Sequence, residues 1–111
     1  MENLNSQSVQ WLCRRAELLS ENGYVHRGLV YQLVAYHMQP LDQAVLHGLA
    51  KMFTLAGDGS RALEVIRKLE ALGVDEAHLS LLRANAYLVM GDTEETAKIL
   101  ARHLTAPGWI A

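Results

Sequence analysis

The chain is 111 residues long, a length that fits one small domain. Half of the residues are apolar, 20% are charged and the formal net charge is -2, which excludes a disordered chain and predicts a globular, helix-rich one. Lysine and arginine are scattered among acidic residues and no apolar run is long, so nucleic acid, anionic membrane surfaces and a membrane span are excluded.

The polar N-terminal segment and the single cysteine indicate the compartment. Residues 1–10 have neither the basic region nor the apolar region of a secretory signal. Cys13 has no second cysteine with which to form an internal disulfide. We therefore expect the chain to work in a reducing cytosol.

The first half of the chain predicts three helices. Apolar residues at three- and four-residue spacing predict a helix over 8–22. A second helix is predicted over 25–37, ending before a proline that cannot continue it. A third is predicted over 42–56, and the Gly-Asp-Gly-Ser sequence of 57–60 predicts a turn.

The second half predicts three more helices and no strand. The fourth helix is predicted over 61–72 and ends at a glycine. Asp75 is the expected cap of the fifth helix, which is apolar on almost every side and is therefore expected to be buried on most of them. Asp92 and Glu95 resemble a capping box at the start of the sixth, which ends before Pro107. The prediction is an all-α fold of six helices in three antiparallel pairs.

A period of 34 residues runs through these elements. Four sets of equivalent positions share it: a glycine, an alanine seven residues earlier, a large apolar residue four earlier and a small residue five later. In that order they are Gly23, Gly57 and Gly91; Ala16, Ala50 and Ala84; Leu19, Phe53 and Tyr87; and Gly28, Ala62 and Thr96. Chance explains one such set but not four. Small residues let paired helices approach closely, so we expect the alanines to be buried against the last set.

These sets resemble the tetratricopeptide-repeat (TPR) family over the whole chain. The repeats would span about 9–40, 43–75 and 77–108. The resemblance implies a TPR-like α-solenoid of three helix-turn-helix repeats that acts as a binding protein. The sequence departs from the family pattern where an aromatic residue is expected early in each repeat, at Leu12, Leu46 and Ser80.

The last repeat resembles a particular group of TPR proteins. Residues 81–104 read LLRANAYLVMGDTEETAKILARHL, a Gly-Asp turn followed by an alanine-containing helix. This is similar to the small TPR chaperones of bacterial type III secretion, above all the YscY-like kind that partners the small exported YscX protein. The resemblance implies a bacterial cytoplasmic chaperone that covers a small secreted protein and presents it to the export apparatus, with the export gate protein as a further partner. A needle-subunit chaperone, and a generic TPR scaffold outside secretion, remain alternatives.

No active site, metal or cofactor is expected. The sequence has no nucleophile motif and no paired carboxylates, and the turn at 57–60 has no following lysine to make a phosphate loop. His47 and His78 fall on neighbouring inner helices and are expected to face one groove. A stable metal site needs three or four ligands, and Cys13 is the only soft candidate nearby.

The first helix of each repeat lines the concave side of a TPR stack, and its positions left free by helix packing predict a partner-binding groove. They are Gln10, Cys13, Glu17, Ala44, His47, Lys51, His78, Leu81, Asn85 and Leu88. The TPRs that clamp a terminal carboxylate have Lys and Asn where this chain has Cys13 and Glu17. We therefore expect a partner helix or an extended segment with apolar anchors.

The C-terminal end predicts a second surface. Most TPR domains append a helix that covers the last apolar face, and too few residues follow Leu104 to form one. The expected surface consists of Ile99, Leu100, Leu104, Trp109 and Ile110. We expect a helix of the partner to cover it, or a second copy of the chain, giving a homo-oligomer without the partner.

Overall fold

In the computed structural model, residues 2–105 are described, with side chains from residue 5 onward. Over this range the chain forms six helices and no strand, which confirms the predicted all-α class. The helices are α1 (Glu2–Glu21), α2 (Val25–Met38), α3 (Gln43–Leu55), α4 (Gly59–Ala71), α5 (Glu76–Val89) and α6 (Thr93–Thr105). None of these six is both long enough and apolar enough to cross a membrane.

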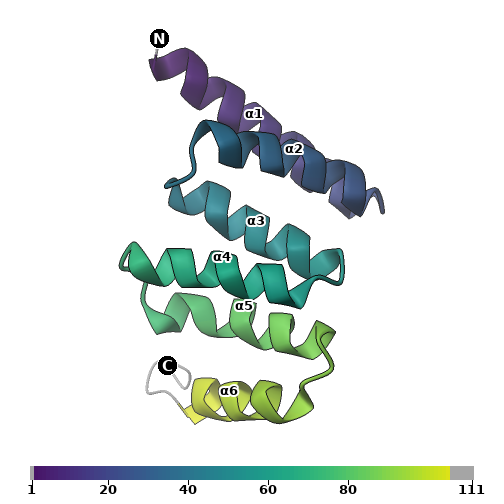
Figure 1. The fold of residues 1–111 in the computed structure, drawn as a ribbon, viewed down its shortest axis with the longest axis vertical. Helices are drawn as coiled ribbons and strands as arrows, with labels where there is room; N and C mark the ends of the chain where they lie inside the picture. Colours follow the sequence, from purple (N-terminus) through teal and green to yellow (C-terminus); the bar gives the residue numbers. More distant parts are fainter. Residues whose placement is uncertain (1, 106–111) are drawn as a thin grey trace.

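Successive helices run antiparallel and stack in chain order, so that α1 and α2, α3 and α4, and α5 and α6 form a first, second and third pair (Figure 1). The stack is elongated, with extents of 45 × 27 × 24 Å. Each helix packs on the next, and the backbones of α1 and α3, and of α3 and α5, also approach one another. Within residues 2–105 the even-numbered helices do not approach one another in this way. The odd-numbered helices therefore lie on the side where successive pairs come closest together, which we call the shorter side of the stack.

Four inter-helix turns have a glycine in the left-handed region. Its φ is 88° at Gly23, 82° at Gly57, 90° at Gly73 and 81° at Gly91. The residue after each glycine donates its N–H to the carbonyl five residues earlier, as Asp58 does to Phe53 at 2.8 Å. This bond satisfies a carbonyl that the end of the helix leaves free, and glycine adopts positive φ without a steric penalty.

The close approach of paired helices is confirmed at the predicted small residues. Ala16 and Ala50 have no exposed surface, and Ala84 is 2% exposed. A Cβ added at Gly28 would lie 2.7 Å from the carbonyl oxygen of Ala16, and Thr96 Oγ1 donates to the carbonyl of Ala84 at 3.4 Å. The 34-residue period therefore reflects the places where the two backbones of each pair come together.

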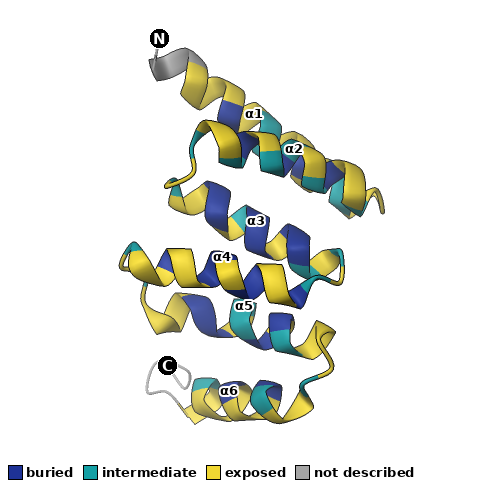
Figure 2. Cartoon of the chain, in the orientation of Figure 1, coloured by how far each residue is buried: buried dark blue, intermediate teal, exposed yellow. Residues whose placement is uncertain are grey.

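The main hydrophobic core joins the second and third pairs. Its most deeply buried large residues are Leu46, Leu49, Ile66, Leu69 and Leu79. A smaller cluster of Val9, Ala35 and Val45 joins the first pair to α3. Figure 2 shows buried residues along α3, α4 and α5, whereas α6 is mostly exposed.

The expectation that the fifth helix is buried on most sides is wrong. The exposed fractions are 52% at Leu81, 54% at Leu88, 42% at Val89 and 46% at Met90. The reason is the place of α5 in the stack: α3 and α4 cover one side and α6 covers another, and no further described helix covers the rest.

The helix boundaries differ from the predicted ones by more than one residue at two places. α1 begins at Glu2 rather than at residue 8, because residues 2–7 contain no glycine or proline that would end it. α4 begins at Gly59 rather than at residue 61, since Asp58 is already its cap: the Asp58 carboxylate accepts a hydrogen bond from the N–H of Arg61 at 3.1 Å.

The predicted caps of the last two helices have different outcomes. The Asp92 carboxylate accepts from the N–H of Glu95 at 3.1 Å, as expected for the start of α6. Asp75 stands at the cap position of α5, but its side chain makes no capping hydrogen bond. Its carboxylate lies instead 3.5 Å from Nδ1 of His78.

Candidate partner-binding surfaces

A polar groove lies between α1 and α3 on the shorter side of the stack. Two adjoining cavities, of about 350 and 210 Å³, share Cys13, Glu17 and Ala44 in their walls. The first also contains Gln10, and the second His47 and Lys51. The structure therefore brings together the groove residues predicted on the first two repeats.

The wall of this polar groove contains a residue that the sequence analysis missed. Gln32 of α2 is 1% exposed, and its Nε2 donates to the carbonyl of Val45 at 2.9 Å and lies 3.5 Å from Cys13 Sγ. A Cβ on Gly48 would lie 2.6 Å from that nitrogen, so Gly48 provides the space. The signal was the 34-residue period, because the equivalent positions are Ile66 and Leu100 and a glutamine among them is unusual.

Two titratable side chains of the polar groove are shifted toward their neutral forms. Burial raises the pKa of the Cys13 thiol, and the charge of Asp42 adds to the increase, while the hydrogen bond from Gln32 opposes it. Burial also lowers the pKa of His47, and the charge of Lys51 lowers it further. At neutral pH the groove thus presents a thiol and an uncharged imidazole.

A third cavity, of about 470 Å³, opens where α3 meets the turn between α4 and α5. His47 and His78 both line it, which confirms that they face one groove. Asp75 is also part of its wall. Among residues 2–105 no three histidine, cysteine, aspartate or glutamate side chains gather closely enough to hold a metal ion.

The predicted groove residues Leu81, Asn85 and Leu88 do not line these three cavities and are exposed on α5. The period explains where Leu81 lies. Its equivalent in the first pair is Cys13, which lies beside Gln32, and the equivalent of Gln32 in the third pair is Leu100. Leu81 and Leu100 therefore lie next to each other on the side of the third pair that points away from the second.

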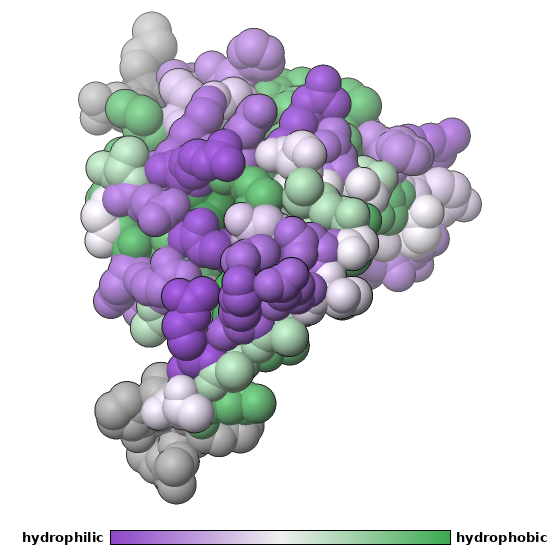
Figure 3. All heavy atoms as spheres, turned by 60° about the horizontal axis from the view of Figure 1, so that its bottom comes forward, coloured by the Kyte–Doolittle hydropathy of each residue, from purple (hydrophilic) through white to green (hydrophobic). Residues whose placement is uncertain are grey.

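We call this side the C-terminal end face and define it by Leu81, Leu88, Leu100 and Leu104. Leu100 is 37% exposed and Leu104 is 47% exposed, as expected for the predicted C-terminal surface. Figure 3, which brings the α6 end of the stack forward, shows hydrophobic residues exposed between rows of hydrophilic ones.

One residue of the predicted C-terminal surface is wrong, and two lie outside the described residues. Ile99 is 5% exposed because it lies between Thr96 and His103 on the side of α6 that packs on α5. Trp109 and Ile110 belong to the part of the chain after residue 105, which the structure does not describe.

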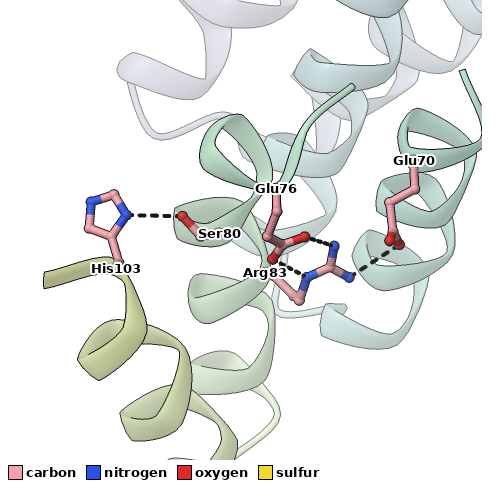
Figure 4. Close-up of polar contacts among 5 residues, drawn as sticks. All are labelled: Glu70, Glu76, Ser80, Arg83 and His103. Atoms are coloured by element: carbon pink, nitrogen blue, oxygen red, sulfur yellow. Dashed lines mark hydrogen bonds and ion pairs between the residues drawn. The ribbon is translucent and has the colours of Figure 1, made fainter. Parts of the chain in front are cut away.

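Polar contacts tie the third pair together and to the second (Figure 4). Arg83 of α5 donates to Glu76 at 2.9 Å, and its guanidinium lies 3.4 Å from the carboxylate of Glu70 on α4. On another side of α5, the Ser80 hydroxyl lies 3.0 Å from Nδ1 of His103. These contacts hold α5 and α6 in place and leave the C-terminal end face free of them.

Neither a scan against models of known protein families nor a search of curated proteins returned a match for this sequence. The functional assignment therefore rests on the residues and their geometry.

Proposed function

We propose that the chain is a TPR-like solenoid of three helix pairs that acts as a bacterial, cytoplasmic chaperone of type III secretion. In this role it binds a small YscX-like secreted protein, covers that protein's apolar helices and presents it to the export apparatus and the export gate protein. A needle subunit is the alternative substrate within the same machinery.

The observation that carries the proposal is the C-terminal end face. A small domain that leaves four leucines between 37% and 54% exposed on one face gains stability when a partner buries them. An export substrate with apolar helices has the same need. Mutual burial would keep both proteins soluble until the substrate is exported.

The α1–α3 polar groove supports the proposal that a segment of the partner binds along the stack. It lies in the first two pairs, apart from the C-terminal end face, and carries both cations and anions, among them Lys51, Glu17 and Asp42. A partner segment that has apolar anchors at one end and polar groups at the other fits this gradient.

The test is co-expression of the chain with a YscX-like protein and, in a second arm, with a needle subunit. Leu88→Asp places a charge on the C-terminal end face and should abolish co-purification while leaving the helical circular dichroism unchanged. The matched control is Val30→Asp, because Val30 is 60% exposed and its equivalents are Glu64 and Lys98. Equal capture by the Leu88→Asp variant and the wild type would exclude this face as the binding site.

A generic TPR scaffold outside secretion is the second candidate. The observation that favours it is the presence of two surfaces of different chemistry, one polar and one apolar, which could join two cytosolic proteins. Genomic neighbours separate the candidates, since a secretion chaperone is expected beside genes of the export apparatus. Capture of two cytosolic proteins, each lost with a variant of a different surface, would favour the scaffold.

A further inference from the structure

The first pair exposes residues at positions that the other two pairs bury. Val45 and Leu79 are equivalent through the 34-residue period and are 1% and 0% exposed, yet Trp11 at the same position is 56% exposed. Met52 and Ala86, also equivalent, are 4% and 0% exposed, whereas Leu18 is 50% exposed. Val45 packs on Val9 and Ala35 of the preceding pair, so these positions face backward along the stack. Among the described residues no helix pair precedes the first, so there these positions are exposed.

Val34 of α2 extends this exposed surface. The rings of Trp11 and Tyr31 meet edge to face with centroids 6.0 Å apart, and Val34 lies one turn after Tyr31 and is 44% exposed. We call Trp11, Leu18 and Val34 the N-terminal end face.

The third pair has the opposite half of the same interface. Gln32 and Ile66 are equivalent, face forward along the stack, and are 1% and 0% exposed. Leu100 at the same position is 37% exposed. The two end faces are therefore the two halves of an interface that the chain already makes twice, between its first and second pairs and between its second and third.

The contacts inside the stack show what would meet if that interface were made a third time, between two copies. Gln32 of the first pair contacts Val45 of the second through a hydrogen bond of 2.9 Å. The equivalent residues are Leu100 of one copy and Trp11 of a second copy. The internal bond is accepted by the backbone carbonyl of Val45, and Leu100 has no donor for the equivalent carbonyl of Trp11, so the contact between copies is apolar.

A second internal contact changes in the same way. Lys68 Nζ of the second pair donates to the Tyr36 hydroxyl of the first pair at 2.6 Å. The equivalent residues at a junction between copies are Val34 of one copy and Leu104 of the other, and both are exposed in the single chain. The two end faces thus match in register as well as in polarity.

We propose that, without its partner, the protein associates head to tail, with the C-terminal end face of one copy on the N-terminal end face of the next. The junction repeats the packing between pairs inside the chain. Each added copy leaves one face free at either end, so the contact does not close and the assembly grows with concentration. This inference goes beyond the proposed function, because the N-terminal end face has no part in it.

The first test is the molar mass of the full chain, measured by light scattering after size exclusion over a range of concentrations. The mass of the wild type should rise with concentration above the 12.3 kDa of one chain. Trp11→Glu and Leu100→Glu should each lower the mass to that of one chain. Val30→Glu, an exposed control off both faces, should behave as the wild type does.

The decisive step mixes the two variants. The Trp11→Glu chain keeps a functional C-terminal end face, and the Leu100→Glu chain keeps a functional N-terminal end face. Their equimolar mixture should give the mass of two chains and no more, because the remaining faces are both blocked. A mixture that stays at the mass of one chain would overturn the head-to-tail junction, and so would association of either variant alone.

Two further outcomes are informative. A wild type that remains at the mass of one chain at every concentration overturns the proposal, and deletion of residues 106–111 would then show whether that segment covers the face itself. If Leu100→Glu loses helicity, Leu104→Glu replaces it on the same face. Co-purification of the secreted partner is measured separately, so failure of the stacking leaves the chaperone proposal to its own test.

Discussion

Ala50 lies where α3 crosses α4, with no exposed surface and Ala62 of α4 equally buried. The variant Ala50→Leu adds three carbon atoms at a site that has no room for them, and should reduce the free energy of unfolding by about 1 to 3 kcal/mol. Thermal unfolding followed by circular dichroism measures the loss. Ala71→Leu, at an exposed position on α4, is the matched control. An unchanged melting temperature for Ala50→Leu would contradict the close crossing.

The contacts of Gln32 and Gly48 show what could not be predicted for a single residue from the sequence. The period identifies the small residues at the crossings, since burial at Ala16, Ala50 and Ala84 follows from position alone. It also marks Gln32 as a polar residue at a position that is apolar in the other two pairs, but it does not identify the partner of that glutamine, because the backbone carbonyl of Val45 has no sequence signature.

Helix caps are the feature of the separate elements that is most open to experiment. The Asp58 carboxylate accepts from the backbone N–H of Arg61 at 3.1 Å and starts α4. Asp58→Ala should therefore reduce the free energy of unfolding by roughly 0.5 to 2 kcal/mol at neutral pH. Asp75→Ala is the control, since Asp75 occupies the same position on α5 without a capping hydrogen bond. Equal losses for the two variants would contradict the capping role of Asp58.

The effect of Asp58→Ala should also depend on pH. The hydrogen bond from the N–H of Arg61 lowers the pKa of Asp58 below its ordinary value of 3.8, and the Arg61 side chain lowers it further, while slight burial opposes them. A carboxyl whose pKa is lower in the folded state stabilises that state above the unfolded pKa, and the contribution is lost as pH falls through the folded pKa. The difference in stability between wild type and variant should thus be constant above about pH 5 and shrink below about pH 4.

The elements themselves were largely predictable, because their signals are local. Apolar spacing and turn glycines predict six helices, and all six are present. The length of α1 was not predictable, since a polar segment without helix breakers, such as residues 2–7, carries no apolar stripe. The exposure of α5 was not predictable either, because the burial of a helix depends on which other helices cover it and not on its own composition.

The same limit applies to the candidate site. The period placed Cys13, Glu17 and Lys51 in one groove, because repeated positions on successive helices share a side of the stack. It did not separate that groove from the C-terminal end face, where Leu81 lies. Leu81 lies on an exposed face because no further helix pair follows the third in the described chain. The position of a pair within the stack cannot be inferred from one repeat alone.

At the scale of the whole molecule, stability should vary along the stack. Each pair contacts only its neighbours, so the free energy of local opening is set by the buried surface around each helix. The main core cluster lies in α3, α4 and α5, whereas on α6 only Thr96 and Ile99 are buried. α6 is held mainly on one side, against α5.

We therefore predict that the amides of α6 exchange with solvent deuterium faster than those of α3 and α4, in a mass-spectrometric experiment on the wild type at low concentration. Ser80→Ala, which removes the 3.0 Å contact with His103, should accelerate exchange in α6 and leave α3 unchanged, since the contact joins only the last two helices. Ser60→Ala, at an exposed position in α4, is the control. Equal exchange rates in all six helices would mean that the stack opens only as a unit, and that the third pair is as firmly held as the centre despite its uncovered leucines.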